Sequence, residues 1–386
     1  MEELSELILE KLSTLVIVVN EQGSVDYVSS SSLKVLGYDS KLLLGEAWWD
    51  LTRNSKEEIA IVKNISKKMF SECQKGFFPQ PYERLLKTSS GKNKWILWNT
   101  TVGPENTMVA IGYDITERKI AEQKLLKANA ILSQHNAEML ESINYAQRIQ
   151  QSILPPKQLI EQLFSGGFVL YKPKDIVSGD FYWFYEKSDA FYIAAVDCTG
   201  HGVPGALLSV LANSLLKNVI DGCNFCEPAQ ILYELDIELH KELNSGKDYL
   251  ASDGMDISLC KFYKDKSKAV FAGAFRPMIL VRNGEIIEFK GNRNPIGFYG
   301  GAEKLFEQKE IDLQINDTFY LFSDGYIDQF GGENNKKLNK RRFKELLLTM
   351  ETMDISEQEA FLEYAFNNWK QDSEQTDDIV VVGIRI

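Results

Sequence analysis

Residues 115–154 contain neither glycine nor proline, and the next proline is Pro155. Along this stretch apolar side chains recur three or four positions apart, which is the spacing of one helix face. The stripe consists of Leu125, Ala128, Leu132, Met139, Ile143, Ala146, Ile149 and Ile153, and polar His135 and Asn136 interrupt it. The spacing predicts one long amphipathic helix, so the chain divides into two regions, 1–114 and 155–386, joined by helix 115–154.

The apolar stripe of this helix is too long and too narrow for the helix to bury it alone. A parallel coiled coil with a second copy of the chain would bury it, because apolar side chains at this spacing pack into holes on a facing helix. We therefore expect a homodimer through residues 115–154. Packing of the stripe against the chain's own two regions is the alternative.

Composition restricts the partners. With 386 residues, of which 44% are hydrophobic and 25% charged, the chain has the composition of a soluble protein of two domains. The net charge of −12 argues against nucleic acid as a partner, because phosphate backbones require a basic surface. Apolar runs such as residues 13–19 are far shorter than the roughly 20 residues of a membrane helix, so we expect no membrane partner.

The cysteines and the first residues bear on the compartment. The start of the chain, MEELSELILEKL, is charged and amphipathic, unlike a secretory signal. The five cysteines are an odd number, and only Cys223 and Cys226 form a C-x-x-C pair. We expect reduced thiols in a cytoplasmic protein.

The two outer regions differ in pattern. Residues 1–114 mix short strands and helices, with a strand–turn–strand at 14–29, short helices ending at Gly37 and Gly45, a hairpin at 82–102 and a final strand within 106–116. Residues 155–386 contain strand-like runs joined by turns such as RNGE, which predicts largely antiparallel sheets. The helical runs of this second region are 203–220, 227–245, 340–350 and 356–370.

Aspartates stand at the ends of several predicted strands in the second region. Asp180 precedes one strand, Asp197 and Asp324 end two others, and Asp377 and Asp378 precede the last. A single aspartate at such a position is usually a turn cap, but four strand ends can converge on one cleft. Carboxylates that converge repel one another unless cations bind between them. Oxygen ligands favour hard ions, so we predict two Mg²⁺ or Mn²⁺ ions, which would activate water and neutralise a phosphoryl group.

The segment GHGVPG at residues 200–205 also matches the dinucleotide-binding pattern G-x-G-x-x-G. That interpretation requires a parallel strand–helix–strand unit with a pyrophosphate at the helix N-terminus. Asp197 would place a carboxylate beside the phosphates, and hairpins dominate the sequence that follows. We therefore favour a tight glycine turn beside a metal site.

From about Ala146 to the C-terminus the chain resembles the PPM phosphatases of the protein phosphatase 2C fold, in the bacterial SpoIIE-like branch. The resemblance rests on AQRIQQSILP, SGDFYWF, VDCTGHGVPGALLS, GMDISLC, FAGAFRPMILVRNGE, NPIGF, LFSDGYIDQ and TDDIVVV, which occur in the order of that family. It implies an αββα sandwich of two antiparallel sheets, and hydrolysis of phosphoserine or phosphothreonine by a hydroxide that bridges two metal ions.

The same resemblance implies roles for individual residues. Asp197 bridges both metals, the Cys198 carbonyl binds one, Asp324 and Asp377 hold the second, and Asp180 binds the first or orients water on it. Asp378 is expected to support these ligands. His201 either donates to the phosphate or the leaving oxygen, or caps the following helix. The candidates for a phosphate-binding cation are Lys172, Lys174, Arg276 and Arg293, and for each a solvated surface role is the favoured interpretation.

Residues from about 5 to 118 resemble a PAS sensor domain, on the segment VIVVNEQGSVDYVSSSSLKVLGYDSKLLLGEAWWDL and the closing GYDITERKIAEQKL. The three histidines lie outside this region and the flavin-photoreceptor cysteine pattern is absent, so a histidine-ligated haem and that photochemistry are excluded. Trp48, Trp49, Trp95 and Trp98 could line a pocket, although such residues are more often core. The ligand of this domain is not identified by the sequence.

The combined interpretation is an α+β sensor phosphatase: a PAS domain at 1–114, a coiled-coil helix at 115–154 and a SpoIIE-like phosphatase domain at 155–386. Its substrate is expected to be a phosphoprotein, such as a STAS-type anti-sigma-factor antagonist. One alternative is a non-catalytic pseudophosphatase that binds a phosphoprotein. Another is a histidine kinase using His135, which the absence of ATP-binding glycine motifs argues against.

Overall fold

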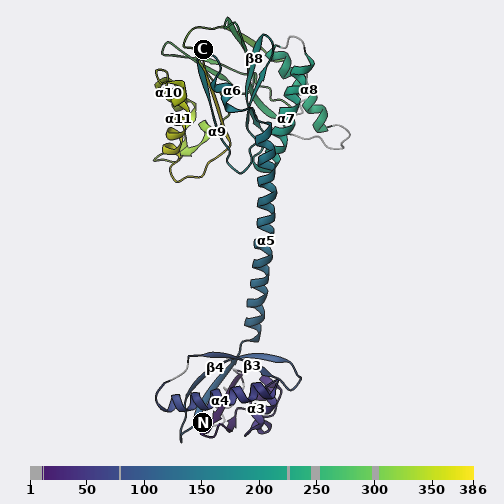
Figure 1. Ribbon diagram of the computed structural model, residues 1–386, viewed down its shortest axis with the longest axis vertical. Coiled ribbons are helices and arrows are strands. Elements are labelled where there is room, and N and C mark those ends of the chain that lie inside the picture. Colours follow the sequence, from purple (N-terminus) through teal and green to yellow (C-terminus); the bar gives the residue numbers. More distant parts are fainter. Residues whose placement is uncertain (1–10, 12, 78–79, 224–226, 245–252, 298–303) are drawn as a thin grey trace. The chain divides into compact units, whose positions relative to one another are not determined.

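The computed structural model describes residues 11, 13–77, 80–223, 227–244, 253–297 and 304–386. The chain forms two compact units, Met1–Asn136 and Ala137–Ile386, and helix α5 (Thr116–Ile153) contributes to both (Figure 1). The boundary between the units therefore lies within the long helix.

The N-terminal unit is one antiparallel sheet covered by helices. The strand order is β2-β1-β5-β4-β3, and the strands are β1 (Thr14–Val19), β2 (Val25–Val28), β3 (Tyr82–Lys87), β4 (Asn93–Val102) and β5 (Met108–Asp114). Side chains of this sheet form one core with α2 (Ser32–Leu36), the 3-10 helix η1 (Ser40–Leu43), α3 (Ala47–Thr52) and α4 (Lys56–Gln74). The predicted strand–turn–strand, hairpin and final strand are confirmed.

Helix α4 is absent from the sequence-based prediction. Its start carries a clear local signal, because the Ser55 hydroxyl accepts a hydrogen bond from the backbone N–H of Glu58 at 3.1 Å. The Glu58 carboxylate in turn accepts from the backbone N–H of Asn54 at 2.9 Å. Such reciprocal capping satisfies amide groups that a helix start leaves unpaired.

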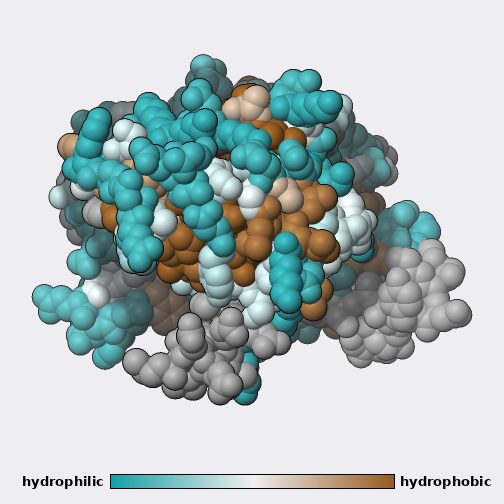
Figure 2. All heavy atoms as spheres, turned by 90° about the horizontal axis from the view of Figure 1, so that it is seen from below, coloured by the Kyte–Doolittle hydropathy of each residue, from teal (hydrophilic) through white to brown (hydrophobic). Residues whose placement is uncertain are grey.

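The surface of the N-terminal unit is not uniformly polar. Figure 2 shows a hydrophobic area, in brown, between hydrophilic side chains on the face in view. The helices of this unit and their connections expose Leu33, Leu42, Leu44, Leu51 and Ile61.

Helix α5 begins at a well-defined junction. The Asp114 carboxylate accepts hydrogen bonds from the backbone N–H and the hydroxyl of Thr116, at 3.0 and 2.6 Å. The Thr116 hydroxyl also accepts from the backbone N–H of Trp95 at 3.0 Å, which ties the helix start to β4. The single long helix predicted from the sequence is confirmed. Of its residues only Gln150 is fully buried.

The C-terminal unit contains two five-stranded antiparallel sheets. The first has the order β13-β10-β9-β8-β7 and the second β12-β11-β14-β17-β6. The strands are β6 (Gly166–Lys172), β7 (Phe181–Glu186), β8 (Ala190–Cys198), β9 (Met255–Tyr263), β10 (Lys268–Ala274), β11 (Met278–Arg282), β12 (Glu285–Phe289), β13 (Gln308–Asp312), β14 (Thr318–Phe322) and β17 (Ile379–Arg385). A separate two-stranded hairpin pairs β15 (Phe330–Gly331) with β16 (Lys336–Lys337).

These two sheets pack face to face. One apolar cluster draws on both of them, and Phe262 of β9 meets Phe319 of β14 edge to face with ring centroids 5.2 Å apart. Helices cover the outer faces: α7 (Gly202–Gly222) and α8 (Pro228–Asn244) the first sheet, α10 (Asn339–Thr349) and α11 (Ile355–Lys370) the second (Figure 1). The predicted αββα sandwich is confirmed. Two short helices, α6 (Lys157–Glu161) and α9 (Gly325–Asp328), complete the unit.

Helix α7 is, among the described residues, the one helix long and apolar enough to cross a membrane. This weak signal has a simple explanation, because the helix belongs to the core against the first sheet through Leu208, Ala212, Leu216 and Ile220.

The cysteines differ in state. Cys73, Cys198 and Cys260 are buried free thiols. Cys223 is disulfide-bonded, so the expectation of a reduced thiol is wrong at that position, and Cys226 lies outside the described residues.

Candidate active site

Three carboxylates converge on one guanidinium at the ends of the strands. Arg276 Nη2 lies 2.8 Å from Asp197 Oδ2, 3.1 Å from Asp256 Oδ2 and 2.7 Å from Asp324 Oδ2. The Arg276 side chain is 17% exposed, so this is a semi-buried cluster rather than a surface ion pair. The favoured interpretation of Arg276 as a solvated surface residue is therefore wrong.

Strand pairing explains the convergence. Asp197, near the end of β8, stands directly opposite Asp256 of β9 in the antiparallel register. Asp324 follows β14 in the other sheet and occupies the N-cap position of α9, with no capping hydrogen bond from its side chain. Arg276 lies between β10 and β11, where the chain passes from the first sheet to the second. The site thus draws residues from both sheets.

Burial and charge crowding set the electrostatics of this cluster. Burial raises the pKa of Asp197 to about 7, although Arg276 lowers it, and Asp324 and Asp256 raise it further. Burial likewise raises the pKa of Asp256 to about 6, again against the influence of Arg276. For Arg276 burial lowers the pKa, but the three carboxylates outweigh it and the net shift is upward. One guanidinium thus stands among an excess of negative charge.

The other predicted aspartates belong to the same electrostatic group. Asp180 is 3% exposed, and burial followed by repulsion from Asp197 raises its pKa well above the usual range. Burial also raises the pKa of Asp377, with Asp324 contributing to the upward shift. The fold therefore brings together Asp180, Asp197, Asp324 and Asp377.

Asp378 holds the backbone of the segment that precedes Asp180. Its carboxylate accepts hydrogen bonds from the backbone N–H groups of Lys174 and Gly179, both at 2.7 Å. Because Asp378 is 1% exposed, these two bonds fix the segment before Asp180 to the start of β17.

Gln150 joins the end of helix α5 to that same segment. Its amide donates to the Ser178 carbonyl at 2.6 Å and to the Ser209 hydroxyl of α7 at 2.8 Å, and its carbonyl accepts from the Ser178 N–H at 3.1 Å. Sequence reasoning did not single out Gln150. Gln150 is the one fully buried residue of α5. Its partner Ser178 lies two residues before Asp180 in the sequence, so Gln150 links the helix to the site.

The glycine turn after β8 is shaped by close backbone packing. A Cβ atom at Gly205 would lie 2.2 Å from the Gly200 carbonyl oxygen, and one at Gly179 would lie 2.5 Å from that same oxygen. Gly200 itself has φ of +83°, which side chains disfavour. The glycines therefore let the turn approach the segment before Asp180, and no dinucleotide is needed to explain them.

The remaining candidates have other contacts. His201 occupies the N-cap position of α7 but makes no capping hydrogen bond, so the capping alternative is wrong. Its Nδ1 lies 2.9 Å from Asp175 Oδ2 and its Nε2 lies 3.3 Å from Lys174 Nζ.

The Cys198 side chain is buried at the end of β8. Lys172 forms an ion pair with Glu363 at 3.0 Å, and Arg293 is exposed.

Asp256 is the site residue that sequence reasoning missed. It lies in the quoted segment GMDISLC, and its position opposite Asp197 becomes visible only once the strand register is known. The sequence did offer a signal for Asp256, because it stands at the start of a predicted strand, as Asp180 and Asp377 do.

The donor set fits divalent cations. Apart from Arg276, the clustered side chains offer carboxylate oxygens, the ligands that Mg²⁺ and Mn²⁺ prefer. Asp197 Oδ2 is buried and, despite its proximity to Arg276, has no hydrogen-bond partner of suitable geometry in the described part of the chain, as expected of an oxygen placed to face a cation. Within the described ranges, no three acidic, histidine or cysteine side chains are arranged as a finished ligand set.

Comparison with known proteins accords with this geometry. Residues 187–386 match the family described as Stage II sporulation protein E (SpoIIE). The chain belongs to the SpoIIE family. Residues 13–117 match the family described as PAS domain, so a PAS domain precedes the PP2C-type phosphatase domain of this SpoIIE-family protein.

Two relatives of the SpoIIE-family domain are informative. The structure of the SiaA-PP2C domain of Pseudomonas aeruginosa is 33% identical, with a TM-score of 0.60, over 65% of this chain and 98% of that one. Phosphoserine phosphatase RsbU of Bacillus subtilis (strain 168) is 25% identical over 203 residues, 50% of this chain and 55% of that protein. The chain thus spans about half the length of this curated relative.

The raised carboxyl pKa values predict how pH acts on stability. Burial raises the pKa of Asp197 to about 7 and that of Asp256 to about 6 in the folded protein, whereas the usual pKa of 3.8 applies in the unfolded chain. Proton binding therefore favours the folded state, and in EDTA we expect the melting temperature to fall as pH rises from about 4 to 7. With saturating Mn²⁺ the slope should flatten or reverse, because metal binding requires ionised carboxylates. Equal slopes with and without Mn²⁺ would contradict this.

Proposed function

We propose that this SpoIIE-family protein is a sensor-regulated, metal-dependent protein serine/threonine phosphatase. The observation that carries the proposal is the convergence of Asp197, Asp256 and Asp324, from both sheets, on Arg276. The family match supports it, because the converging residues lie within the matched range 187–386.

The residues divide into two chemical roles. Asp180, Asp197, Asp324, Asp377 and the Cys198 carbonyl would hold two Mg²⁺ or Mn²⁺ ions, with Asp256 beside them. Bound ions of this kind supply Lewis acidity that activates a water and neutralises phosphoryl oxygens.

The second role, binding of the phosphoryl group, would belong to Arg276. Its planar guanidinium can bind two phosphoryl oxygens at once, and its carboxylate partners hold it at the site. His201 lies beside Lys174 and Asp175, where the imidazole could exchange a proton with the leaving oxygen of the substrate.

The test is hydrolysis of p-nitrophenyl phosphate by the purified full chain. We expect turnover with Mn²⁺, loss of turnover in EDTA and recovery when Mn²⁺ is restored. If the full chain is inactive, a bound phosphoprotein in place of hydrolysis would support the pseudophosphatase alternative. Turnover that survives EDTA would rule out the metal-dependent mechanism.

The substrate we propose is a phosphoserine or phosphothreonine protein, such as a STAS-type antagonist of an anti-sigma factor. The support is the likeness to RsbU, whose name states phosphoserine phosphatase activity. Incubating the protein with a phosphorylated STAS protein, and following release of inorganic phosphate, tests this assignment separately from p-nitrophenyl phosphate hydrolysis.

We further propose that α5 forms a homodimeric coiled coil that transmits the state of the PAS domain. Large apolar side chains lie exposed along the helix, among them Leu125 at 61%, Leu132 at 58% and Met139 at 63%. Exposed apolar stripes of this kind are buried by a facing helix. The contact of Gln150 with Ser178 supplies the link from the helix to the segment before Asp180.

Inserting two residues after Asn129 should change phosphatase activity several-fold without unfolding either unit. The insertion rotates the two ends of the helix relative to each other by about 200°, at 3.6 residues per turn. Activity, sedimentation and circular dichroism of this variant should be compared with those of a seven-residue insertion, which keeps the stripe in register. A monomer at micromolar concentration, or equal activity of both insertions and the wild type, would argue against transmission through a coiled coil.

A further inference from the structure

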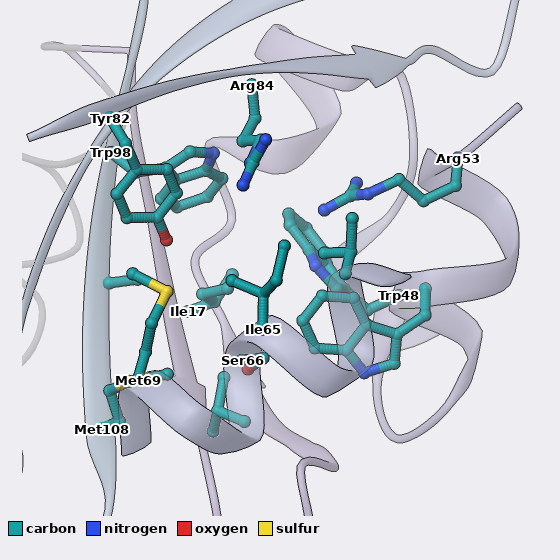
Figure 3. A pocket seen from close by; sticks show the side chains of 14 residues that line it. Ile17, Trp48, Arg53, Ile65, Ser66, Met69, Tyr82, Arg84, Trp98 and Met108 are labelled. Carbon is teal, nitrogen blue, oxygen red and sulfur yellow. The ribbon is translucent and has the colours of Figure 1, made fainter. Parts of the chain in front are cut away.

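The PAS domain contains a cavity of about 40 Å³ between its sheet and its helices. Its walls are mainly aromatic and apolar, and they include Trp48, Trp49, Trp98, Met69 and Met108. The expectation that tryptophans line a pocket therefore holds for three of the four candidates. Two arginines, Arg53 and Arg84, also line it, and Figure 3 shows both guanidinium groups pointing inward.

Arg53 is a buried cation with incomplete hydrogen bonding. The residue is 5% exposed, and its Nη1 donates to the carbonyl and the hydroxyl of Thr52 at 3.1 and 2.7 Å. Its Nε is buried without a hydrogen-bond partner among the described residues, because the nearest carboxylate oxygen, on Glu58, is 3.9 Å away. Trp48 also lines the cavity, and its Nε1 is a second buried donor without a partner among the described residues. Figure 3 shows this nitrogen on the ring edge that points away from the two guanidinium groups.

Arg84 brings a second positive charge to this place. It projects from β3 over the Tyr82 ring, with its guanidinium carbon 5.7 Å from the ring centroid, and no ion pair joins it to another described residue. Burial lowers the pKa of Arg53 to about 10, Glu58 raises it and Arg84 lowers it again. Two cations thus face one cavity, Arg53 buried and Arg84 half-buried, and the Glu58 carboxylate, 3.9 Å from Arg53 Nε, is not among the residues that line it. Buried charges and donors in proteins are ordinarily paired, so this arrangement lacks an anion.

We propose that this cavity binds a short-chain monocarboxylate, with its carboxylate on Arg53 and Arg84 and its hydrocarbon part against the tryptophan and methionine side chains. The guanidinium groups select the planar carboxylate, which they bind through charge-assisted hydrogen bonds. The size follows from the volume, since about 40 Å³ corresponds to the space of about three water molecules. A carboxylate with a tail of one or two carbons matches that space, and a flavin or haem far exceeds it.

The test is a titration of the full chain with sodium propionate, followed by tryptophan fluorescence and by the melting temperature. We expect a saturable fluorescence change and a rise in melting temperature with propionate. Propionamide, which has the same shape without the charge, and sodium chloride at equal ionic strength should give neither. These readouts report binding directly, so they do not depend on the proposed phosphatase activity.

Variants locate the site. Arg84→Gln should weaken propionate binding about tenfold or more, because it removes a charge-assisted contact. Arg53→Lys keeps the positive charge but loses the planar guanidinium, so it should also weaken propionate binding. Circular dichroism identifies a variant that fails to fold. Arg118→Gln is the matched control and should bind as the wild type does, since Arg118 is 58% exposed and pairs with Glu83 outside the cavity.

Two results would overturn the proposal. One is the absence of any saturable change with propionate in the wild-type chain. The other is a change that propionamide reproduces, or that Arg84→Gln and Arg118→Gln leave equally intact, because the cavity's charge would then play no part in binding.

Discussion

Replacing Asp197 by asparagine should lower Mn²⁺-dependent hydrolysis of p-nitrophenyl phosphate at least about a hundredfold. Asp197 holds the central position of the cluster: it contacts Arg276 and interacts electrostatically with Asp180, Asp324, Asp256 and Asp377. Asparagine keeps the shape of the side chain but removes the charge that would hold a cation. The loss should therefore appear in activity and in the Mn²⁺ concentration required, and not in the circular dichroism spectrum.

Asp372→Asn is the matched control, because Asp372 is an exposed aspartate of the same unit outside the cluster. It should retain wild-type activity and wild-type Mn²⁺ dependence. If Asp197→Asn also retained both, the assignment of Asp197 as the central metal ligand would be wrong.

Arg276→Met should lower the kcat/KM for p-nitrophenyl phosphate about tenfold to a hundredfold at saturating Mn²⁺. The reason is the loss of charge-assisted hydrogen bonds to the phosphoryl group, each worth about 1.5–3 kcal/mol. Unlike Asp197→Asn, this variant should still depend on Mn²⁺.

The same variant has a second readout. Without Arg276, three carboxylates lose their shared positive partner, so in EDTA the melting temperature should fall below that of the wild type. Saturating Mn²⁺ should restore it. Arg293→Met is the control, since Arg293 is exposed, and it should change neither quantity. Unchanged kcat/KM in Arg276→Met would remove Arg276 from the proposed substrate contacts.

Local sequence patterns were sufficient to predict much of the fold. The absence of glycine and proline from 115–154, with apolar spacing of three and four, identified helix α5 nearly to its ends. Turns such as RNGE identified hairpins, for example the pairing of β11 with β12. Helix α4 was missed although its cap is local, and short strands such as β13 were missed because their apolar alternation is weak.

The site was only partly accessible to the same reasoning. Strand-end aspartates and quoted motifs identified Asp180, Asp197, Asp324 and Asp377, since each stands beside a turn signal in its own segment. Asp256 was missed, and Arg276 was named as a candidate but assigned a surface role, because nothing in their own segments shows that they meet Asp197 and Asp324 across strand pairs and between sheets.

The sequence by itself determined the order of the regions, the long helix, the antiparallel sheets and the acidic character of the site, because each depends on residues close together in the chain. Only the tertiary structure decided which charges share a buried space. Arg276 is an ordinary basic residue in the sequence and becomes the partner of three carboxylates in the fold. Likewise, Arg53 Nε becomes a buried donor without a partner among the described residues only when the sheet and helices enclose it. Burial sets the cost of an unpaired charge, and burial is a property of the packed molecule.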